Sequence, residues 1–332
     1  MKLTSTKFIF TLLITFLTCF GQTVWAQTVY YVNAGFSSTP SGTLGETWDN
    51  PYTDLQDALA VAGDEDEIWV AAETYKPTTN SDRTISFVLK DGIEIYGGFP
   101  DNLTAANDND FSLREPAINT TILSGQIDVG NSYHVLTADN TVNNALVDGF
   151  TIQGGLADGA SVTDKKGGAF FNDGGKVTFN ECVFTNNTTD NLGSGGAITV
   201  ENFGELTVTN CVFENNIAGN GGAISLLTSS ANTSIINCEF NNNTGLGGGG
   251  AIFCISSIGH QVINSLFHNN SSTNGGANGG AVLVFPGAEI TLTNCTLSNN
   301  NAANIGGGLH LQDGTVTIQN SILWGNTSSN AD

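Results

Sequence analysis

The sequence predicts an all-β fold, a right-handed parallel β-helix (a solenoid) with an N-terminal capping helix. Two repeated motifs support this prediction. Gly-Gly-Ala plus an apolar residue, or the variant Gly-Gly-Leu, recurs at steps of 26 to 30 residues, starting at Gly167, Gly195, Gly221, Gly249, Gly279 and Gly307. Between them lie Cys182-Val183-Phe184-Thr185-Asn186-Asn187 and its relatives, which start at Cys211, Cys238, Ser265, Cys295 and Ser321. Repeats rich in Gly, Asn and β-branched residues indicate stacked strands and not stacked helices.

The strands of each coil follow from the apolar columns that appear when the repeats are aligned on that Cys or Ser. Position +2 holds Phe184, Phe213, Phe240, Phe267, Leu297 and Leu323; position −3 holds Phe179, Val208, Ile235, Val262, Leu292 and Ile318; position −5 holds Val177, Leu206, Thr233, His260, Ile290 and Val316. The parity of these positions breaks between −3 and 0, so one straight strand cannot bury them all. We therefore expect two short strands that meet at a bend near Asn210 and its equivalents.

The Gly-Gly-Ala segment supplies a third strand in each coil. Its inner face is ambiguous, because Ile198, Ile224, Ile252 and Val282 fit the inside whereas Leu309 and Leu311 break the pattern. Three strands in about 28 residues form one coil, which pairs with the next about 4.8 Å along the axis. The right hand follows from the general rule for parallel crossovers.

Two adjacent asparagine columns follow the apolar positions. The first contains Asn186, Asn215, Asn242, Asn269 and Asn299; the second, expected on the outside, contains Asn187, Asn216, Asn243, Asn270, Asn300 and Asn326. Stacked amides can hydrogen-bond along the axis, and Asn tolerates the left-handed backbone that a corner requires. We interpret both columns as structural turns, with a ligand-binding ladder as the alternative.

The cysteines are expected to be free thiols. Outside the N-terminal segment there are five, Cys182, Cys211, Cys238, Cys254 and Cys295, and an odd number is a poor disulfide framework. We place them in one inward column, shared with Ser265 and Ser321, where a small side chain is wanted. Bridges between adjacent coils are the alternative, although parallel side chains stand further apart than a relaxed bridge requires.

Earlier coils and a cap are expected upstream. The segments Asp148 to Gly155, Thr121 to Gly125 and Phe87 to Phe99 resemble coils. Thr53 to Ala62 is a predicted helix, with a capping box of Thr53 and Gln56 and an apolar stripe of Leu55, Ala58, Leu59 and Ala62. Because a solenoid exposes strand edges at its ends, we assign this helix, with Tyr30, Trp48 and Trp69, to covering the first coil.

Residues 1–26 are predicted to be a signal peptide. Lys2 and Lys7 precede an apolar stretch from Phe8 to Phe20, and Val24-Trp25-Ala26 is a cleavage site, so the mature chain starts at Gln27. Lipidation at Cys19 is the alternative, for which Thr18 is a poor fit. Residues 27–120 are then the cap and first coils, and residues 121–332 the repeats. No other segment is expected to cross a membrane.

The charge excludes one class of partner. The formal net charge is −22, and no Lys or Arg follows Lys176. Such a chain repels phosphate backbones, so nucleic-acid binding is not expected. The acidic surface indicates the solubility of an exported protein, with cation binding as the alternative.

The motifs resemble those of known families. Phe-x-x-Asn, as in Phe184 to Asn187, and Gly-Gly-Ala-apolar are similar to the paired repeats of chlamydial polymorphic outer membrane proteins. Thr53 to Leu59, Glu67 to Ala71, Val88 to Gly92 and Tyr96 to Phe99 resemble secreted β-helix proteins of the Bacteroidetes. The resemblance implies display at the cell surface or outer membrane, or secretion, through a C-terminal sorting or autotransporter domain.

No constellation of catalytic residues is evident in the sequence. Polysaccharide-cleaving β-helix enzymes use clustered Asp with an Arg or Lys, yet Arg83 and Arg114 lack such neighbours in sequence, and Gly259-His260-Gln261 does not match a Gly-His-Gly motif. The isolated histidines His134, His268 and His310 and the acidic run Asp64-Glu65-Asp66-Glu67 are interpreted as structural. We predict no catalytic, cofactor-binding or metal-binding residue; calcium at Asp108-Asn109-Asp110 is the alternative, without the full loop pattern.

The predicted function is therefore a non-enzymatic secreted or cell-surface scaffold or adhesin that binds a polysaccharide or a host or matrix protein. The alternative is a divergent polysaccharide lyase or glycoside hydrolase on a pectate-lyase-like β-helix. The chain stops after a coil, at Asp332, with no covering helix. We expect it to continue in a longer protein and, when expressed alone, to associate end to end or to fray in its last coil.

Overall fold

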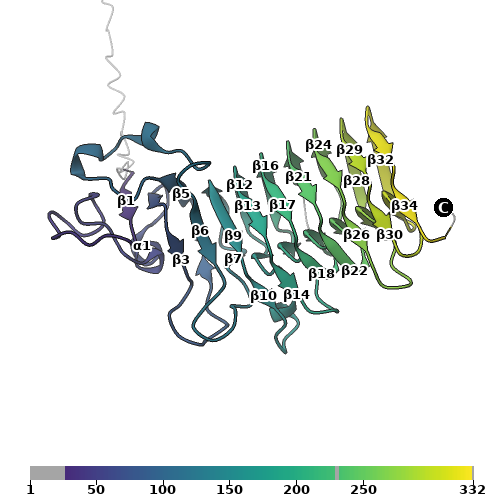
Figure 1. Ribbon diagram of the computed structural model, residues 1–332, viewed down its shortest axis with the longest axis horizontal. Coiled ribbons are helices and arrows are strands. Elements are labelled where there is room, and N and C mark those ends of the chain that lie inside the picture. Colours follow the sequence, from purple (N-terminus) through teal and green to yellow (C-terminus); the bar gives the residue numbers. More distant parts are fainter. Residues whose placement is uncertain (1–26, 229–231, 331–332) are drawn as a thin grey trace, which may run out of the picture.

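The computed structural model describes residues 27–228 and 232–330 and confirms the predicted right-handed parallel β-helix. In Figure 1 the coils stack along the horizontal axis, from the capped end at the left to the C-terminal end at the right. Every strand pairing between named strands is parallel, and each strand inside a sheet pairs with its equivalents in the coils before and after it. The solenoid carries almost no helix.

The strands form four sheets in the described residues, one more than the sequence predicts. The ten-stranded sheet contains β1 (Val29–Val32), β2 (Glu67–Ala71), β5 (Glu94–Phe99), β8 (Ala145–Asp148), β12 (Lys176–Asn180), β16 (Glu205–Thr209), β20 (Thr233–Ile236), β24 (His260–Ile263), β28 (Glu289–Thr293) and β32 (Thr315–Gln319). The nine-stranded sheet contains β3 (Thr74–Tyr75), β6 (Thr121–Ser124), β9 (Phe150–Gln153), β13 (Val183–Thr185), β17 (Val212–Glu214), β21 (Glu239–Asn241), β25 (Leu266–His268), β29 (Thr296–Ser298) and β33 (Ile322–Trp324).

The other two sheets complete each coil. The seven-stranded sheet, absent from the prediction because most of its strands span only two residues, contains β10 (Leu156–Ala157), β14 (Thr188–Thr189), β18 (Ile217–Asn220), β22 (Thr244–Gly248), β26 (Ser271–Ser272), β30 (Asn301–Ala302) and β34 (Thr327–Ser328). The eight-stranded sheet, made by the Gly-Gly-Ala segments, contains β4 (Phe87–Val88), β7 (Leu136–Asp139), β11 (Phe170–Asp173), β15 (Ile198–Glu201), β19 (Ile224–Leu226), β23 (Ile252–Cys254), β27 (Val282–Val284) and β31 (Leu309–Leu311).

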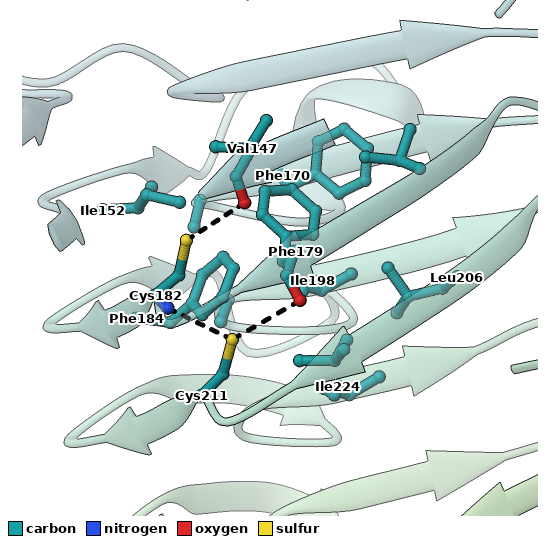
Figure 2. Packing of buried hydrophobic residues seen from close by; sticks show 14 of the residues in the cluster. Val147, Ile152, Phe170, Phe179, Cys182, Phe184, Ile198, Leu206, Cys211 and Ile224 are labelled. Atoms are coloured by element: carbon teal, nitrogen blue, oxygen red, sulfur yellow. Dashed lines mark hydrogen bonds between the residues drawn. The ribbon is translucent and has the colours of Figure 1, made fainter. Parts of the chain in front are cut away.

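The predicted apolar columns face the inside and pack into one core. Phe184, Phe213, Phe240 and Phe267 are fully buried, and their rings stack at 4.6, 4.8 and 4.5 Å between centroids. Figure 2 shows the part of this core around Phe179, Phe184, Cys182 and Cys211. The register places each column residue beside its equivalent, as Phe213 beside Phe240. A continuous stripe of stacked side chains therefore holds successive coils together.

The predicted bend between the first two strands of a coil is confirmed. Asn210 has a φ of 55°, and its equivalents have the same left-handed backbone, at Asn237, Asn264, Asn294 and Asn320. A second left-handed corner follows the nine-stranded sheet, at Asn186, Asn215, Asn242, Asn269 and Asn299. Asparagine occupies both corners because its short polar side chain makes this conformation less costly.

The second asparagine column lies inside the solenoid, which corrects the expectation that it is external. Asn187, Asn216, Asn243, Asn270 and Asn300 are almost completely buried. The Nδ2 of Asn216 donates to the Phe184 carbonyl at 2.9 Å and to Asn243 Oδ1 at 3.0 Å, while its Oδ1 accepts from the main chain and side chain of Asn187. The preceding left-handed residue turns this side chain inward, where the ladder satisfies it fully.

Two other column assignments need correction. Leu309 and Leu311 do not break the third-strand pattern: they pair with Val282 and Val284 and are more exposed because β31 is the last strand of its sheet. Cys254 lies in the third-strand column that ends at Leu311, beside Leu226 and Val284, and not in the column of the other four cysteines. All five are free and buried, and burial raises the pKa of Cys238 to about 11 and of Cys254 to about 12.

The predicted helix forms, as α1 (Leu55–Val61), with a different N-cap. Asp54, not Thr53, caps it: the Asp54 carboxylate accepts from the Gln56 main-chain N–H at 2.9 Å. The Gln56 side chain donates instead to the carbonyls of Pro77 and Ser86. The four apolar residues of the predicted stripe are buried in the core, so the helix covers the first coils as expected.

The aromatic residues assigned to the cap divide between two places. Tyr30 packs on the main core, but Trp48 and Trp69 form a separate cluster with Tyr31 and Phe99. Trp69 faces away from the main core because its neighbours on β2 face that core. Its ring stacks on Phe99, with 4.8 Å between the ring centroids. Short 3₁₀ turns at Ala105–Asn107 and Phe111–Leu113 lie in the loop beyond this cluster, and a third lies at Thr163–Lys165.

The predicted signal peptide, with Cys19, lies outside the described residues. Within residues 27–228 and 232–330, no helix has the length and apolar character needed to cross a membrane.

Candidate functional site

Most of the arginine and histidine residues considered above as possible catalytic groups make hydrogen bonds or ion pairs within the fold. Arg83 donates to the carbonyls of Asn131 and Leu156 and pairs with Asp158, so it ties two loops together. His134 is buried, its Nδ1 contacts the Gly167 carbonyl at 3.0 Å, and burial lowers its pKa. His268 contacts Glu239 at 2.8 Å on the outer face of the nine-stranded sheet.

Residues of the acidic segments also accept hydrogen bonds within the fold. Asp66 accepts from the N–H groups of Thr28 and Gly63, and Glu67 accepts from the Trp69 indole. Asp108 accepts from the Trp48 N–H at 2.9 Å, and Asp110 caps the turn at Phe111–Leu113. No cluster of three or more potential metal-binding side chains occurs in the part of the chain that the structure describes.

His260 lies in the core, where the −5 column places it beside Thr233. Neither His260 Nε2 nor Thr233 Oγ1 has a hydrogen-bond partner. Desolvation by burial lowers the His260 pKa to about 4 from an ordinary value of 6.5. The His260 imidazole is therefore protonated less readily in the folded state than in the unfolded state. Its contribution to the free energy of unfolding is fully present above about pH 6.5 and decreases as the pH falls toward 4.

We expect this linkage to cost about 3 kcal/mol between neutral pH and pH 4, from the two pKa values. A His260→Leu variant should lose this pH dependence, because leucine has no titratable group. The variant should keep the fold, because leucine and isoleucine fill the same column at Leu206 and Ile290. Denaturant unfolding of both proteins across this pH range measures it as the difference between the two curves. Parallel pH dependences in the two proteins would contradict the assignment.

One groove brings polar and apolar groups together, at the bend between the ten- and nine-stranded sheets. It has a volume of about 710 Å³. The loop residues Glu115 to Ile118 form one wall, and the coil residues Phe150, Glu181, Val183, Asn210 and Val212 line the rest. Two glutamates and several apolar side chains line it, so the groove has an amphipathic character.

Arg114 lies beside this groove, where the fold brings it two acidic neighbours that are distant in sequence, Asp148 and Glu181. Its guanidinium pairs with Asp148, donates from Nε to the Gly97 carbonyl at 2.6 Å, and lies 3.9 Å from Glu181. The Arg114 and Asp148 side chains are only 9% and 10% exposed. A Cβ atom at Gly149 would collide with this guanidinium, so the glycine makes room for the pair. The cation is thus already neutralised and held in place.

Glu181 occupies the bend at which the following coils have asparagine. Its φ is 50°, a left-handed conformation that costs glutamate more than asparagine. Its side chain is half exposed, and Glu181 is one of the residues that line the groove. The departure of Glu181 from the asparagine column is the sequence signal that could have indicated this site.

A row of side-chain amides runs beside the same bend and leads into the groove, and its members are exposed except for Asn180, which is half-buried at the end of β12. Asn180 Nδ2 donates to Asp148 at 2.8 Å, and each following asparagine donates to the one before it. The Nδ2 to Oδ1 distances are 3.1 Å for Asn210 to Asn180, 3.2 Å for Asn237 to Asn210, 3.3 Å for Asn264 to Asn237 and 3.1 Å for Asn294 to Asn264. We call Asn180, Asn210, Asn237, Asn264 and Asn294 the amide row.

Comparison with known proteins gives one family match. The model of the right handed beta helix region matches residues 68–331. No curated protein matches the chain.

Similar solved structures include a deglycosylated pectin methylesterase from Aspergillus niger, at 14% identity over 89% of this chain and 92% of that one, with a TM-score of 0.47. The pectate lyase Pel9A is 12% identical over 87% of this chain and 78% of that one, with a TM-score of 0.47. An alginate lyase from Paenibacillus sp. str. FPU-7 is 14% identical over 83% and 96%, with a TM-score of 0.41.

Proposed function

The chain belongs to the right-handed β-helix family, and from this premise we propose that it is an exported, non-enzymatic surface scaffold that binds a polysaccharide along the amide row. Residues 1–26 would direct export, residues 27–120 would cap the solenoid, and residues 121–332 would present the binding surface. Association with the outer membrane, as in the Bacteroidetes and chlamydial proteins that the motifs resemble, belongs to the same proposal.

The amide row is the observation that carries this proposal. Asn210, Asn237, Asn264 and Asn294 are exposed, and side-chain hydrogen bonds hold each in one orientation. An amide carries two donor hydrogens and two acceptor lone pairs, so each keeps capacity for an external hydroxyl group. Pre-oriented groups on a rigid surface lose little entropy on binding, which favours an extended polyhydroxyl chain.

We expect an Asn210→Gly/Asn237→Gly double variant to bind neutral polysaccharide about tenfold more weakly, from the loss of one or two hydrogen bonds. Glycine keeps the left-handed backbone at both positions, so the fold is retained. Affinity electrophoresis in gels that contain neutral polysaccharides measures the change. Asn186→Gly/Asn215→Gly, at the other left-handed corner, is the matched control, and equal retardation of both variants would contradict the proposal.

A polysaccharide-cleaving enzyme is the second candidate, and the groove is the observation in its favour. Glu115 and Glu181 line it, and Glu181 lies 3.9 Å from Arg114, which pairs with Asp148. Arg114 is, however, held by Asp148 and the Gly97 carbonyl, which leaves it poorly suited to accept a proton from a substrate. Depolymerisation assays on acidic and neutral glycans distinguish the candidates, since cleavage lost in Glu181→Gln would support the enzyme.

A further inference from the structure

The groove has more negative charge than its own cation can balance. Arg114 is matched by the buried Asp148, which leaves the carboxylates of Glu115 and Glu181 on the lining. Glu181 lies 3.9 Å from Arg114, a longer separation than the hydrogen-bonded contacts of that guanidinium. No Lys or Arg follows Lys176 in the sequence, so the following coils supply no cation of their own. The local potential therefore favours a positively charged occupant.

The backbone at Glu181 adds an independent observation. At this bend the next coils have asparagine, which suits the left-handed φ, yet this coil carries glutamate at a φ of 50°. Stability alone would favour asparagine here as well. A residue that costs conformational energy and also places a carboxylate over a groove is consistent with a role in binding.

The groove also suits a body that is partly apolar. Phe150, Val183 and Val212 line it beside Pro116 and Ile118, and Ile118 is 74% exposed. The apolar face of a sugar ring can lie against such a surface while its polar groups reach the edges. Asn210 belongs both to this lining and to the amide row, so a chain bound along the row continues into the groove.

We propose that the groove binds an amine-bearing sugar, an amino sugar without an N-acyl group, whose ammonium group is held by Glu181 and Glu115. This inference rests on the proposed glycan binding and names the class of sugar that the groove selects. The amide row holds the neutral part of the chain, and the two carboxylates recognise the cation at its end. Charge complementarity, apolar lining and continuity with the row favour this occupant.

The test compares a fully deacetylated glucosamine tetramer with the N-acetylated tetramer by calorimetric titration, at a pH at which the amines are protonated. The wild-type protein should bind the deacetylated tetramer more tightly. Glu181→Gln should weaken that binding about fivefold, as expected for one partly exposed ion pair, and should leave the N-acetylated tetramer unaffected. Glu115→Gln should act in the same direction.

Two controls separate this site from general effects. Glu289→Gln removes one charge from an exposed position outside the groove and should change neither affinity. Glu181→Asn restores the residue of the other bends, so it should unfold at a temperature no lower than wild type while losing the same affinity. Equal affinities for the two tetramers, or equal losses in Glu181→Gln and Glu289→Gln, would overturn the inference.

The same proteins distinguish this failure from failure of the proposed function. Neutral polysaccharide binding that is lost in Asn210→Gly/Asn237→Gly, without a preference for the deacetylated tetramer, would refute the amine site alone. Absence of both effects would refute the amide row as well.

Discussion

Replacement of Phe213 by alanine is expected to lower the free energy of unfolding by about 3–5 kcal/mol. Its ring is fully buried and stacks between Phe184 and Phe240, at 4.6 and 4.8 Å and nearly parallel to both. Truncation removes the transfer energy of the ring and leaves a cavity in the middle of the stack. Neighbouring rings cannot fill this space, because strand pairing fixes each phenylalanine in its own coil.

Chemical denaturation measures this loss, and Val212→Ala is the control on the same strand. Val212 faces outward and is half-buried, so its truncation should cost well under half as much. Equal losses in the two variants would contradict the assignment of the phenylalanine column to the core. Amide hydrogen exchange in the adjacent coils should rise in Phe213→Ala, since the stack connects those coils.

Replacement of Asn216 by alanine is expected to cost about 3–5 kcal/mol, because the change leaves buried polar groups without partners. The main-chain N–H of Asn187 loses its acceptor, and the Phe184 carbonyl loses the Asn216 donor. Each uncompensated group inside the solenoid costs about 1–3 kcal/mol. The loss is therefore similar to that from a deleted core ring, although the side chain is polar.

Asn241→Ala is the matched control for the ladder. Asn241 lies on the outer face of β21, and its side chain makes one long contact, 3.3 Å from Asn269 Nδ2. Its truncation should cost about 0.5 kcal/mol or less. The same denaturation experiment ranks both variants, and an Asn216→Ala loss as small as that of Asn241→Ala would show that water replaces the ladder.

The strands, bends and core columns were predictable from the sequence because a solenoid repeats one local pattern. Phe184 and its equivalents recur at one position in every coil, so their type identifies the column before any coordinates are known. The left-handed bend at Asn210 follows from the broken parity on either side of it. The seven-stranded sheet was missed because most of its strands are two residues long, too short for a detectable alternation.

The candidate groove could not be predicted in the same way. Arg114 comes from a loop outside the repeats, whereas Asp148 and Glu181 lie in two successive coils, and more than 30 residues separate each from the next. Each residue taken alone has an ordinary structural interpretation. The loop around Arg114 reaches over the bend only in the folded chain, with Gly149 providing the space for its guanidinium.

The sequence by itself determined the fold class, the path of each coil and the residue types that fill the core, since side-chain alternation and left-handed corners are local properties. The tertiary structure decided which asparagine column lies inside, because Asn186 and Asn187 are the same residue type and only the backbone direction after the corner distinguishes them. The tertiary structure also decided where charged side chains come together. The contacts among Arg114, Asp148 and Glu181 depend on how segments distant in sequence stack, and the local sequence does not encode that placement.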